Sequence, residues 1–243
     1  MSSHGSHVVY QGPSAYGGDC VAVVTGLGGR PSRNTKCPIP QLWILPAGEE
    51  PHTAQRSGCD ASVCGTCELR PLVYASRKRA GLPTPTHKCY VRTHEAPLSI
   101  ARALARGSYE STDLNSACAA LHASGRPIRL GAFGDPAALP PWTVTALLSA
   151  ARSAGQGHTG YSHAWRLQGA QWLRQYVMAS VSNPVDLASA ELAGWRAFVA
   201  YSGPEPHWPL WTRRKVARCP GSCARCLLCS GGEGPHVTIP SHK

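Results

Sequence analysis

Short apolar segments alternate with helix-like segments over residues 127–201 of this 243-residue chain. The predicted strands are PIRLGAFGD (127–135), HTGYSHAW (158–165), YVMASV (176–181) and WRAFVAY (195–201). The predicted helices lie between them, over 141–154 and 184–193, with a short helical piece around Gln171. Because strands that are joined through helices pair in parallel, this alternation predicts an α/β fold with a partly parallel sheet or a partial β/α barrel.

Both helices of this series carry start and stop signals. The first has Pro141 in its first turn and Gly155 just past its end, and its apolar residues recur at helical spacing. The second has Asn183 as its predicted cap, Pro184 in its first turn and Gly194 as its predicted terminator. These signals make the series the best-ordered part of the sequence.

The rest of the chain has less periodic apolar sequence and is predicted to surround this core. The predicted parts are a flexible N-terminal arm (1–20), a cysteine-rich loop segment (21–96), the α/β core (97–211), a basic cysteine-cluster segment (212–230) and a C-terminal tail (231–243). The core is predicted to begin with a short helix in PLSIARALARG (97–107). A long loop segment needs something other than a hydrophobic core to order it. We therefore expect cysteine-rich metal-binding segments.

A first group of cysteines lies in the loop segment. Cys64 and Cys67 form a C-x2-C turn, in which the backbone curls back so that two thiolates face one ion. Cys89 and Cys59 are candidates to complete a four-thiolate site. Free reduced thiols are the alternative. The cysteines left without a role are Cys20, Cys37 and Cys118.

A second group lies in CPGSCARCLLC (219–229) and consists of Cys219, Cys223, Cys226 and Cys229. Overlapping C-x2-C turns with a fourth cysteine occur in zinc sites and in iron–sulfur clusters, so we expect zinc or an iron–sulfur cluster as the cofactor. The first three cysteines also have the spacing of radical S-adenosylmethionine enzymes. Arg225 stands where that family usually has an aromatic residue, and Cys229 can close the coordination. A closed four-thiolate site is therefore favoured.

Polar residues follow the predicted strands where α/β proteins bind ligands. Asp135 follows the first strand, and His163 and Arg166 lie at the end of the second. Because ligands gather beyond the carboxyl ends of parallel strands, we expect an acid–base or anion-binding site at this edge. The alternatives are that Asp135 makes a turn or caps a helix, and that His163 is a hydrogen-bonded buried residue.

The chain is strongly basic, with 24 Lys and Arg against 13 Asp and Glu and a formal net charge of +11. Such a charge attracts polyanions, nucleic acid first. Basic runs occur at RKR (77–79) and at TRRKVARC (212–219), which adjoins the second cysteine group. The cations that we expect to contact phosphates of DNA or another nucleic acid are Arg213, Arg214, Lys215 and Arg218. A solvated basic surface is the alternative.

The sequence predicts no membrane partner. It has no stretch of about eighteen apolar residues that would span a bilayer, and it starts without a charged and then apolar leader. We therefore expect a cytoplasmic protein, whose cysteines bind metal instead of forming disulfides. The sequence gives no indication of the oligomeric state.

Six segments, taken in order, carry a resemblance to a known family. They are GCDASVCGTCELR, KCYVRTHEAPLSIARALARGSY, PIRLGAFGDPAALP, HTGYSHAW, YVMASVSNPVDLASAELAGWRAF and CPGSCARCLLC. They resemble the phage and plasmid proteins known as gene product eighty-eight, over roughly residues 25 to 230. The resemblance implies a mobile-element origin and a basic α/β protein with cysteine clusters. It assigns no catalytic residue.

Some members of that family are labelled rolling-circle replication initiation proteins. Common initiators hold a metal with a His-x-His triplet, which this sequence lacks, and nick DNA with a tyrosine. If the chain nicks DNA, Tyr161 or Tyr176 is the candidate nucleophile. The leading hypothesis is a nucleic-acid-acting protein of a plasmid or phage, plausibly in replication initiation. The rivals are an α/β metalloenzyme or iron–sulfur enzyme acting on a small molecule or nucleobase, and a zinc-stapled interaction protein without catalysis.

Overall fold

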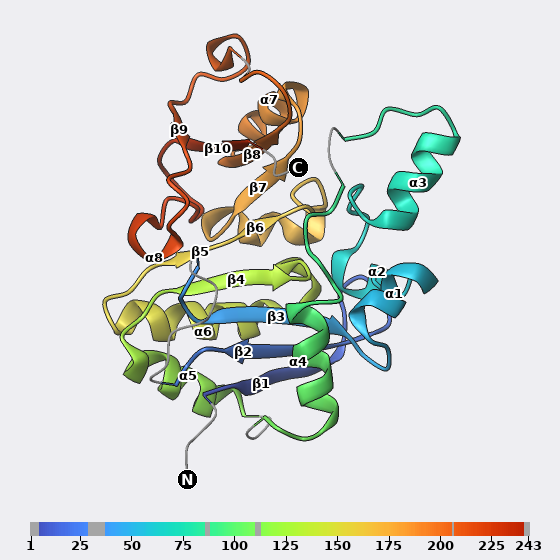
Figure 1. Cartoon of the computed structure of the whole chain (residues 1–243). Helices are drawn as coiled ribbons and strands as arrows, with labels where there is room; N and C mark the ends of the chain where they lie inside the picture. The colour runs from blue at the N-terminus through green and yellow to red at the C-terminus, as the bar shows by residue number, and fades with distance from the viewer. Residues whose placement is uncertain (1–4, 29–36, 86–87, 110–112, 206, 241–243) are drawn as a thin grey trace.

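Two five-stranded sheets organise the chain, and helices cover them (Figure 1). The structure, a computed structural model, describes residues 5–28, 37–85, 88–109, 113–205 and 207–240. One sheet is mixed and the other is entirely parallel. The predicted α/β class with a partly parallel sheet is therefore confirmed.

The first sheet has the strand order β1-β2-β3-β4-β5. Its strands are β1 (His7–Pro13), β2 (Asp19–Thr25), β3 (Gln41–Pro46), β4 (Ile128–Phe133) and β5 (His158–Thr159). The first three are antiparallel neighbours, whereas β4 runs parallel to both β3 and β5. All six residues of β3 are buried, as expected for a central strand that is covered on both faces.

The second sheet has the order β6-β7-β8-β10-β9, and all its strands are parallel. Its strands are β6 (Tyr161–Ser162), β7 (Met178–Val181), β8 (Ala197–Tyr201), β9 (Val216–Arg218) and β10 (His236–Pro240). Gly160 alone separates β5 from β6, so the two sheets meet there. A Cβ atom at Gly160 would lie 3.0 Å from the Cβ of Leu130 and 3.1 Å from Cγ1 of Val177, so this junction leaves no room for a side chain.

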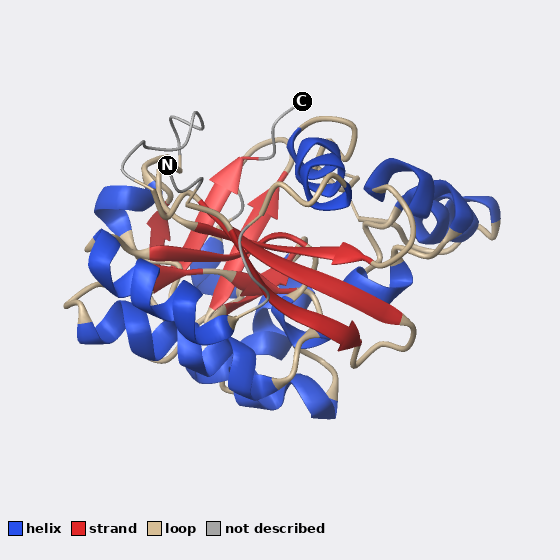
Figure 2. Cartoon of the chain, turned by 90° about the horizontal axis from the view of Figure 1, so that it is seen from below, coloured by secondary structure: helices blue, strands red, loops and turns tan. Residues whose placement is uncertain are grey.

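Helices α5 (Leu114–Ser124) and α6 (Pro141–Ser153) contact each other on one face of the first sheet, and α4 (Ala96–Ala105) lies on its other face (Figure 2). The remaining helices are α1 (Pro51–Ser57), α2 (Ala61–Cys64), α3 (Pro71–Arg79), α7 (Pro184–Leu192) and α8 (Cys223–Cys226). Short 3-10 helices are η1 (Pro136–Ala138), η2 (Gln168–Gln175) and η3 (Trp208–Leu210). None of the helices in the described part of the chain is both long and apolar enough to span a bilayer.

The predicted helices, most of the predicted strands and the predicted helix cap of the core are confirmed. Helices α4, α6 and α7 and strands β4, β7 and β8 form where the sequence places them. The side chain of Asn183 accepts the backbone N–H of Asp186 at 2.8 Å, so it caps α7 as predicted. The predicted strand 158–165 is instead reduced to β5 and β6, because the close approach at Gly160 bends the chain between them.

Three peripheral predictions are wrong. Residues 5–20, predicted as part of a flexible arm, contain β1 and the start of β2, whose run CVAVV is buried in the first sheet. The loop segment 21–96 contains most of β2, all of β3 and three helices. The tail 231–243 supplies β10, which inserts between β8 and β9. These apolar runs are short and have glycine-, serine- or proline-rich flanks, so only their pairing reveals them. The rest of the predicted arm (1–4) and tail (241–243) lies outside the described residues.

His236 ties β10 to β8 at the centre of the second sheet. It is fully buried, and its Nδ1 accepts the backbone N–H of Ala197 at 2.8 Å, which leaves the proton on Nε2. Nε2 lies 3.7 Å from a carboxylate oxygen of Glu191. Burial lowers the pKa of His236 to about 4, although Glu191 opposes the shift. The imidazole is therefore neutral at physiological pH.

This histidine makes folding stability depend on pH. The unfolded chain takes up a proton at about pH 6.5, whereas folded His236 does so only near its pKa of about 4. Stability should therefore fall as the pH is lowered from about 6.5 to about 4 and then level off. His236→Asn keeps an acceptor for the Ala197 N–H but does not titrate, so its urea unfolding curves should lose less stability over this range. Equal pH dependence in both proteins would refute this role for His236.

Candidate functional site

Three thiols meet two of the predicted catalytic residues around one small cavity. The side chains of Cys64, Cys67 and Cys89 line it together with Asp135 and His163, and its volume is about 70 Å³. These residues come from three separate regions of the chain: the α2 turn, the loop before α4, and the ends of β4 and β6. The fold therefore brings together the first cysteine group and the strand-end residues that the sequence identified separately.

The turn that carries Cys64 and Cys67 requires a glycine. Cys64 ends α2, and Gly65 follows it with a φ of 53°. A Cβ atom there would lie 3.0 Å from the ring of Tyr16, in a conformation that side chains rarely adopt. The N–H of Cys67 then donates to the carbonyl of Cys64 at 3.1 Å. Gly65 thus lets the chain reverse so that both cysteines line the same cavity.

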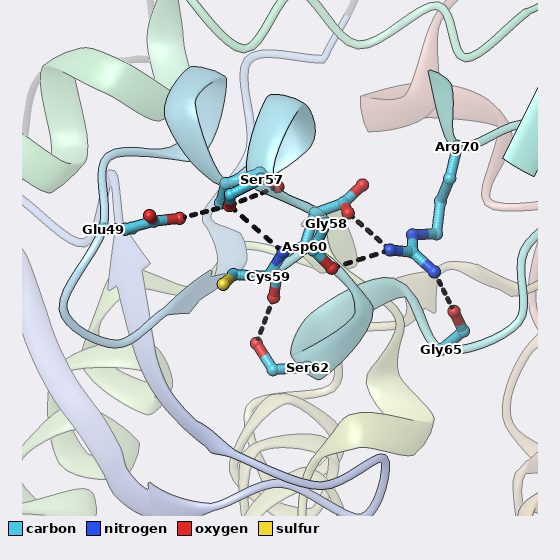
Figure 3. Close-up of polar contacts among 9 residues, drawn as sticks. Glu49, Ser57, Gly58, Cys59, Asp60, Ser62, Gly65 and Arg70 are labelled. Carbon is cyan, nitrogen blue, oxygen red and sulfur yellow. Dashed lines mark hydrogen bonds and ion pairs between the residues drawn. The ribbon is translucent and has the colours of Figure 1, made fainter. Parts of the chain in front are cut away.

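A buried ion pair holds this turn in place (Figure 3). Nη2 of Arg70 lies 2.6 Å from Oδ1 of Asp60 and also donates to the carbonyl of Gly58 at 2.9 Å. Nη1 of Arg70 donates to the carbonyl of Gly65 at 2.8 Å. The side chains of Arg70 and Asp60 are only 11% and 2% exposed. One guanidinium therefore fixes both ends of α2, and we call this arrangement the Asp60–Arg70 clamp.

The three thiols of the cavity are protonated as they stand. Burial raises the pKa of Cys67 to about 12 and that of Cys89 to about 11. Burial, followed by the neighbouring Cys67 and Cys89, raises the pKa of Cys64 well above its ordinary value. A bound cation would reverse this preference, because a metal displaces thiol protons.

Asp135 connects the ends of β4 and β6 through the hydrogen bonds of its carboxylate. Its buried carboxylate accepts from four groups: the N–H of Ala137 at 3.0 Å, Oγ of Ser162 at 2.8 Å, the N–H of His163 at 2.7 Å and the N–H of Ala164 at 3.3 Å. It therefore caps η1, which is the turn-and-cap role that the sequence left open. The same carboxylate fixes the backbone that carries His163.

His163 connects the cavity to a larger cleft. The cleft has a volume of about 690 Å³, and Cys67 and His163 line both spaces. Burial lowers the pKa of His163, while Asp135 and Glu68 oppose the shift. Its imidazole is therefore neutral at physiological pH and able to accept a proton.

Arg166 lies on the wall of the cleft, as expected for a residue after β6. Its guanidinium pairs with Asp186 and stacks on the ring of Trp165 at 3.9 Å from the ring centre. Its charge is thus partly neutralised, and its exposed face points to the same cleft that His163 lines. His163 therefore shares one space with Asp135 and the other with Arg166.

Tyr161 is a constrained residue. Its ring stacks on Phe198 with 4.5 Å between centres, and its hydroxyl lies 3.4 Å from Nη2 of Arg129. Burial raises the pKa of this hydroxyl well above its ordinary value, while Arg129 acts in the opposite direction. Such a phenol is a poor nucleophile at neutral pH unless a base or a metal activates it.

The second cysteine group gathers around α8, across the first sheet from α2 (Figure 1). Burial, followed by the neighbouring Cys219, Cys223 and Cys226, raises the pKa of Cys229 to about 12. Cys219, Cys223 and Cys226 are thus neighbours of Cys229, and the four-thiolate site stays a prediction. Cys59, the other candidate of the first group, is exposed and does not line the cavity.

Neither cysteine group is a ready-made metal site. Among the residues that the structure describes, no three His, Cys, Asp or Glu side chains stand in an arrangement that would already hold an ion. Metal binding by Cys64, Cys67 and Cys89, or by the second group, thus stays a prediction and requires the thiol side chains to reorient.

The basic run after η3 lies on an edge of the second sheet. Strand β9 pairs only with β10, and the run leads into it. Arg213, Lys215 and Arg218 are exposed, and Arg214 is half-buried with a long hydrogen bond of 3.4 Å to the carbonyl of Gly234. Cations on an edge strand also prevent pairing with other chains, so their exposure alone assigns no partner.

Sequence reasoning missed several residues around the cavity. Asp60, Arg70 and Tyr90 line it, Glu68 lines the adjoining cleft, and Arg129 lies beside Tyr161. Asp60 and Arg70 flank the C-x2-C turn on either side, and this placement of an acid and a base could have suggested an ion pair across the turn. The sequence analysis did not predict this ion pair, because it expected a loop segment there and not a buried turn.

A scan against family models gave no match for this chain, and searches of curated proteins and of solved structures returned no significant match. The resemblance to gene product eighty-eight therefore stays a prediction. The geometry of the site is the basis for the functional proposal.

The clamp predicts a large stability loss from a single substitution. Arg70→Met leaves the carboxylate of Asp60 buried without its cation, which should cost about 3–5 kcal/mol in the free energy of unfolding. Urea unfolding measures this loss. The double variant Asp60→Asn/Arg70→Met should lose less than Arg70→Met alone, because it leaves no buried charge.

Arg92→Met is the matched control. Arg92 pairs with Glu95 at 3.0 Å, but the two side chains are 71% and 53% exposed, so the loss should stay under about 1 kcal/mol. Equal losses for Arg70→Met and Arg92→Met would mean that the clamp does not hold the turn.

Proposed function

We propose that this protein is a metal-dependent α/β enzyme, in which Cys64, Cys67 and Cys89 hold zinc or an iron–sulfur cluster beside a substrate cleft. One observation carries the proposal: the cavity lined by these thiols shares Cys67 and His163 with the cleft of about 690 Å³. A purely structural metal needs no such opening, whereas a catalytic metal keeps a coordination position for water or substrate.

The donor set suits the proposed cofactors. Thiolates are ligands of choice for zinc and for iron–sulfur clusters. Three cysteines leave one position open, and Asp135 does not compete for it because its carboxylate already accepts from four protein groups. When bound, the metal would polarise a water molecule or a substrate oxygen or nitrogen.

The surrounding residues have separate roles. Neutral His163 accepts a proton at the mouth of the cavity, and Asp135 positions it by binding its backbone N–H at 2.7 Å. Glu68 and Arg166 provide charges of opposite sign on the cleft wall. Such a mixed wall suits a small polar substrate, for example a nucleobase, better than a long apolar one.

Metal content tests the proposal. Protein purified without oxygen should contain metal, and Cys67→Ser should lose the share that the first group holds. Cys59→Ser is the matched control, because Cys59 lies in the same segment but is exposed and away from the cavity. Elemental analysis and the visible spectrum measure the content and distinguish zinc from iron. Equal metal content in wild type and both variants would overturn the proposal.

His163→Gln separates an enzyme from a metal-stapled protein. If His163 serves as the base, the variant should keep the metal of the first group, and ligands such as free nucleobases should still bind. Loss of that metal from His163→Gln would make His163 a fourth ligand and the site a closed structural one. The sequence hypothesis of a zinc-stapled interaction protein would then be favoured.

A second candidate is nucleic-acid binding, as expected for a plasmid or phage protein in replication. The observation that favours it is the exposed side chain of Trp211, 39% accessible, directly before the exposed cations Arg213 and Lys215. An aromatic side chain beside cations is the arrangement that stacks bases and binds phosphates in single strands. This surface lies on the β9 side of the second sheet, apart from the cavity.

Salt dependence tests this candidate. Binding to single-stranded DNA should weaken with salt, and Arg213→Ala/Lys215→Ala should reduce the slope of log K against log salt by about 0.7 per lost phosphate contact. Lys78→Ala/Arg79→Ala removes the same charge from α3 and should change the slope less. Equal effects of the two double variants would indicate non-specific attraction to a basic protein.

A further inference from the structure

A fifth cysteine joins the second group. Cys37 precedes β3 in the first sheet and is only 2% exposed, whereas the other four thiols follow β9 in the second sheet. We propose that Cys37 is a ligand of a thiolate metal site formed with cysteines of the 219–229 segment, and that this site joins the two sheets. This site is separate from the cavity of the proposed enzyme.

Strand pairing brings the two segments together. Arg129 on β4 is paired on one side with Gln41 of β3 and on the other with Thr159 of β5. The side chain of Gln41 donates to the carbonyl of Cys37 at 3.3 Å. One residue beyond Thr159, the N–H of Gly160 donates to the carbonyl of Cys229 at 2.9 Å. Cys37 and Cys229 are thus anchored to the same part of the sheet, on either side of Arg129.

The thiol of Cys37 contacts the second group directly. The side chain of Cys37 shares a hydrogen bond with that of Cys223. Cys223 is in turn a close neighbour of Cys219 and Cys229. Leu227, between the last two cysteines, has a φ of 47°, and no other non-glycine residue in the described part of the chain has a positive φ. Such a conformation is unfavourable for a residue with a side chain, so the surroundings hold this loop in a specific shape.

Arg196 is a buried cation that has no acidic partner in the described part of the chain. It is 2% exposed, and its guanidinium donates to the carbonyls of Leu228, Ser230 and Pro235 at 2.7 to 2.9 Å. Among the described residues, no carboxylate lies within ion-pair distance of it. The thiol of Cys229 is one of its neighbours.

Arg129 repeats the pattern on the other side of the group. Its Nη2 lies 3.4 Å from the hydroxyl of Tyr161 and 3.5 Å from that of Tyr90, and the thiols of Cys37 and Cys223 are also neighbours. Within the described ranges no carboxylate pairs with it either. Two guanidinium groups therefore lie near cysteines and have no carboxylate partner among the described residues.

Charge balance explains this arrangement. Arg196 is buried and Arg129 is half-buried, and with neutral thiols neither cation has an anionic partner among the described residues, which is costly. Four thiolates around a divalent ion carry a net charge of −2, and so do four thiolates around a common oxidised four-iron cluster. Arg129 and Arg196 match that charge. Each bound thiol releases its proton to solvent when the metal enters.

The ligand test uses a chain whose first group is removed by Cys64→Ser, Cys67→Ser and Cys89→Ser. This background should still bind one metal or cluster, so the outcome does not depend on the proposed enzyme site. Adding Cys37→Ser should weaken zinc binding and reduce the thiolate-to-metal charge-transfer band of the cobalt-loaded protein, which grows with the number of thiolates. Anaerobic reconstitution with iron and sulfide, followed by the visible spectrum, tests whether the same cysteines bind an iron–sulfur cluster.

Cys118→Ser is the control, because Cys118 lies on α5 outside both groups. If the chain without the first group does not fold, Cys37→Ser and Cys118→Ser are compared in the otherwise unchanged protein. Cys37→Ser should then lower the total metal content, and Cys118→Ser should not. Cys37→Ser that matches Cys118→Ser in affinity and in the cobalt band would overturn the proposal. A Cys37–Cys223 disulfide in protein purified under reducing conditions without metal would also overturn it.

Metal affinity and metal-free stability of an Arg129 variant test the charge balance separately. Arg129→Met should weaken metal affinity about 10- to 100-fold, as expected for loss of a group that supports the ligands. The metal-free variant should be at least as stable as the metal-free parent, because it no longer buries an uncompensated cation. A merely structural arginine would instead lower stability in both states. Unchanged metal affinity in Arg129→Met would contradict the charge balance.

Discussion

The ion pair between Arg70 and Asp60 is the interaction on which the candidate site depends. It lies within a segment whose sequence alone would form a loop, and it binds the carbonyls at both ends of α2 with one guanidinium. Desolvating two charges is expensive, and such a pair is maintained only when its geometry and additional hydrogen bonds offset that cost. Here the ion pair fixes the position of the Cys64–Cys67 turn. It holds the turn against the ends of β4 and β6, next to Asp135 and His163.

The two cysteine groups have opposite electrostatic surroundings. Near the first group the one buried arginine is already paired with Asp60, and the carboxylate of Asp135 is saturated by hydrogen bonds. Near the second group, Arg129 and Arg196 lack carboxylate partners among the described residues. We infer a division of roles: a less charged centre that opens to a cleft, and a dianionic centre that joins the two sheets. The Tyr161 ring lies between Arg129 and the cavity.

Local signals predicted local structure well. The proline and glycine punctuation placed α6 and α7 correctly, and the cap at Asn183 is present as expected. Strands β1, β2, β3 and β10 were missed, because each is a short apolar run whose burial depends on partners far along the chain. The same limit applies to the sites. The C-x2-C turn was visible, but the place of Cys37 follows only from the pairing of β3 with β4 and of β4 with β5.

The most direct test of the central claim is to locate the metal. Anomalous X-ray diffraction from crystals of anaerobically purified protein, recorded at the zinc and iron absorption edges, places each bound metal without reference to activity. The account predicts an anomalous peak enclosed by the sulfur atoms of Cys64, Cys67 and Cys89, with one side open towards His163 and the cleft. A peak at the second group with none between these three sulfur atoms would contradict it, since the clamp would then present the turn to an empty cavity.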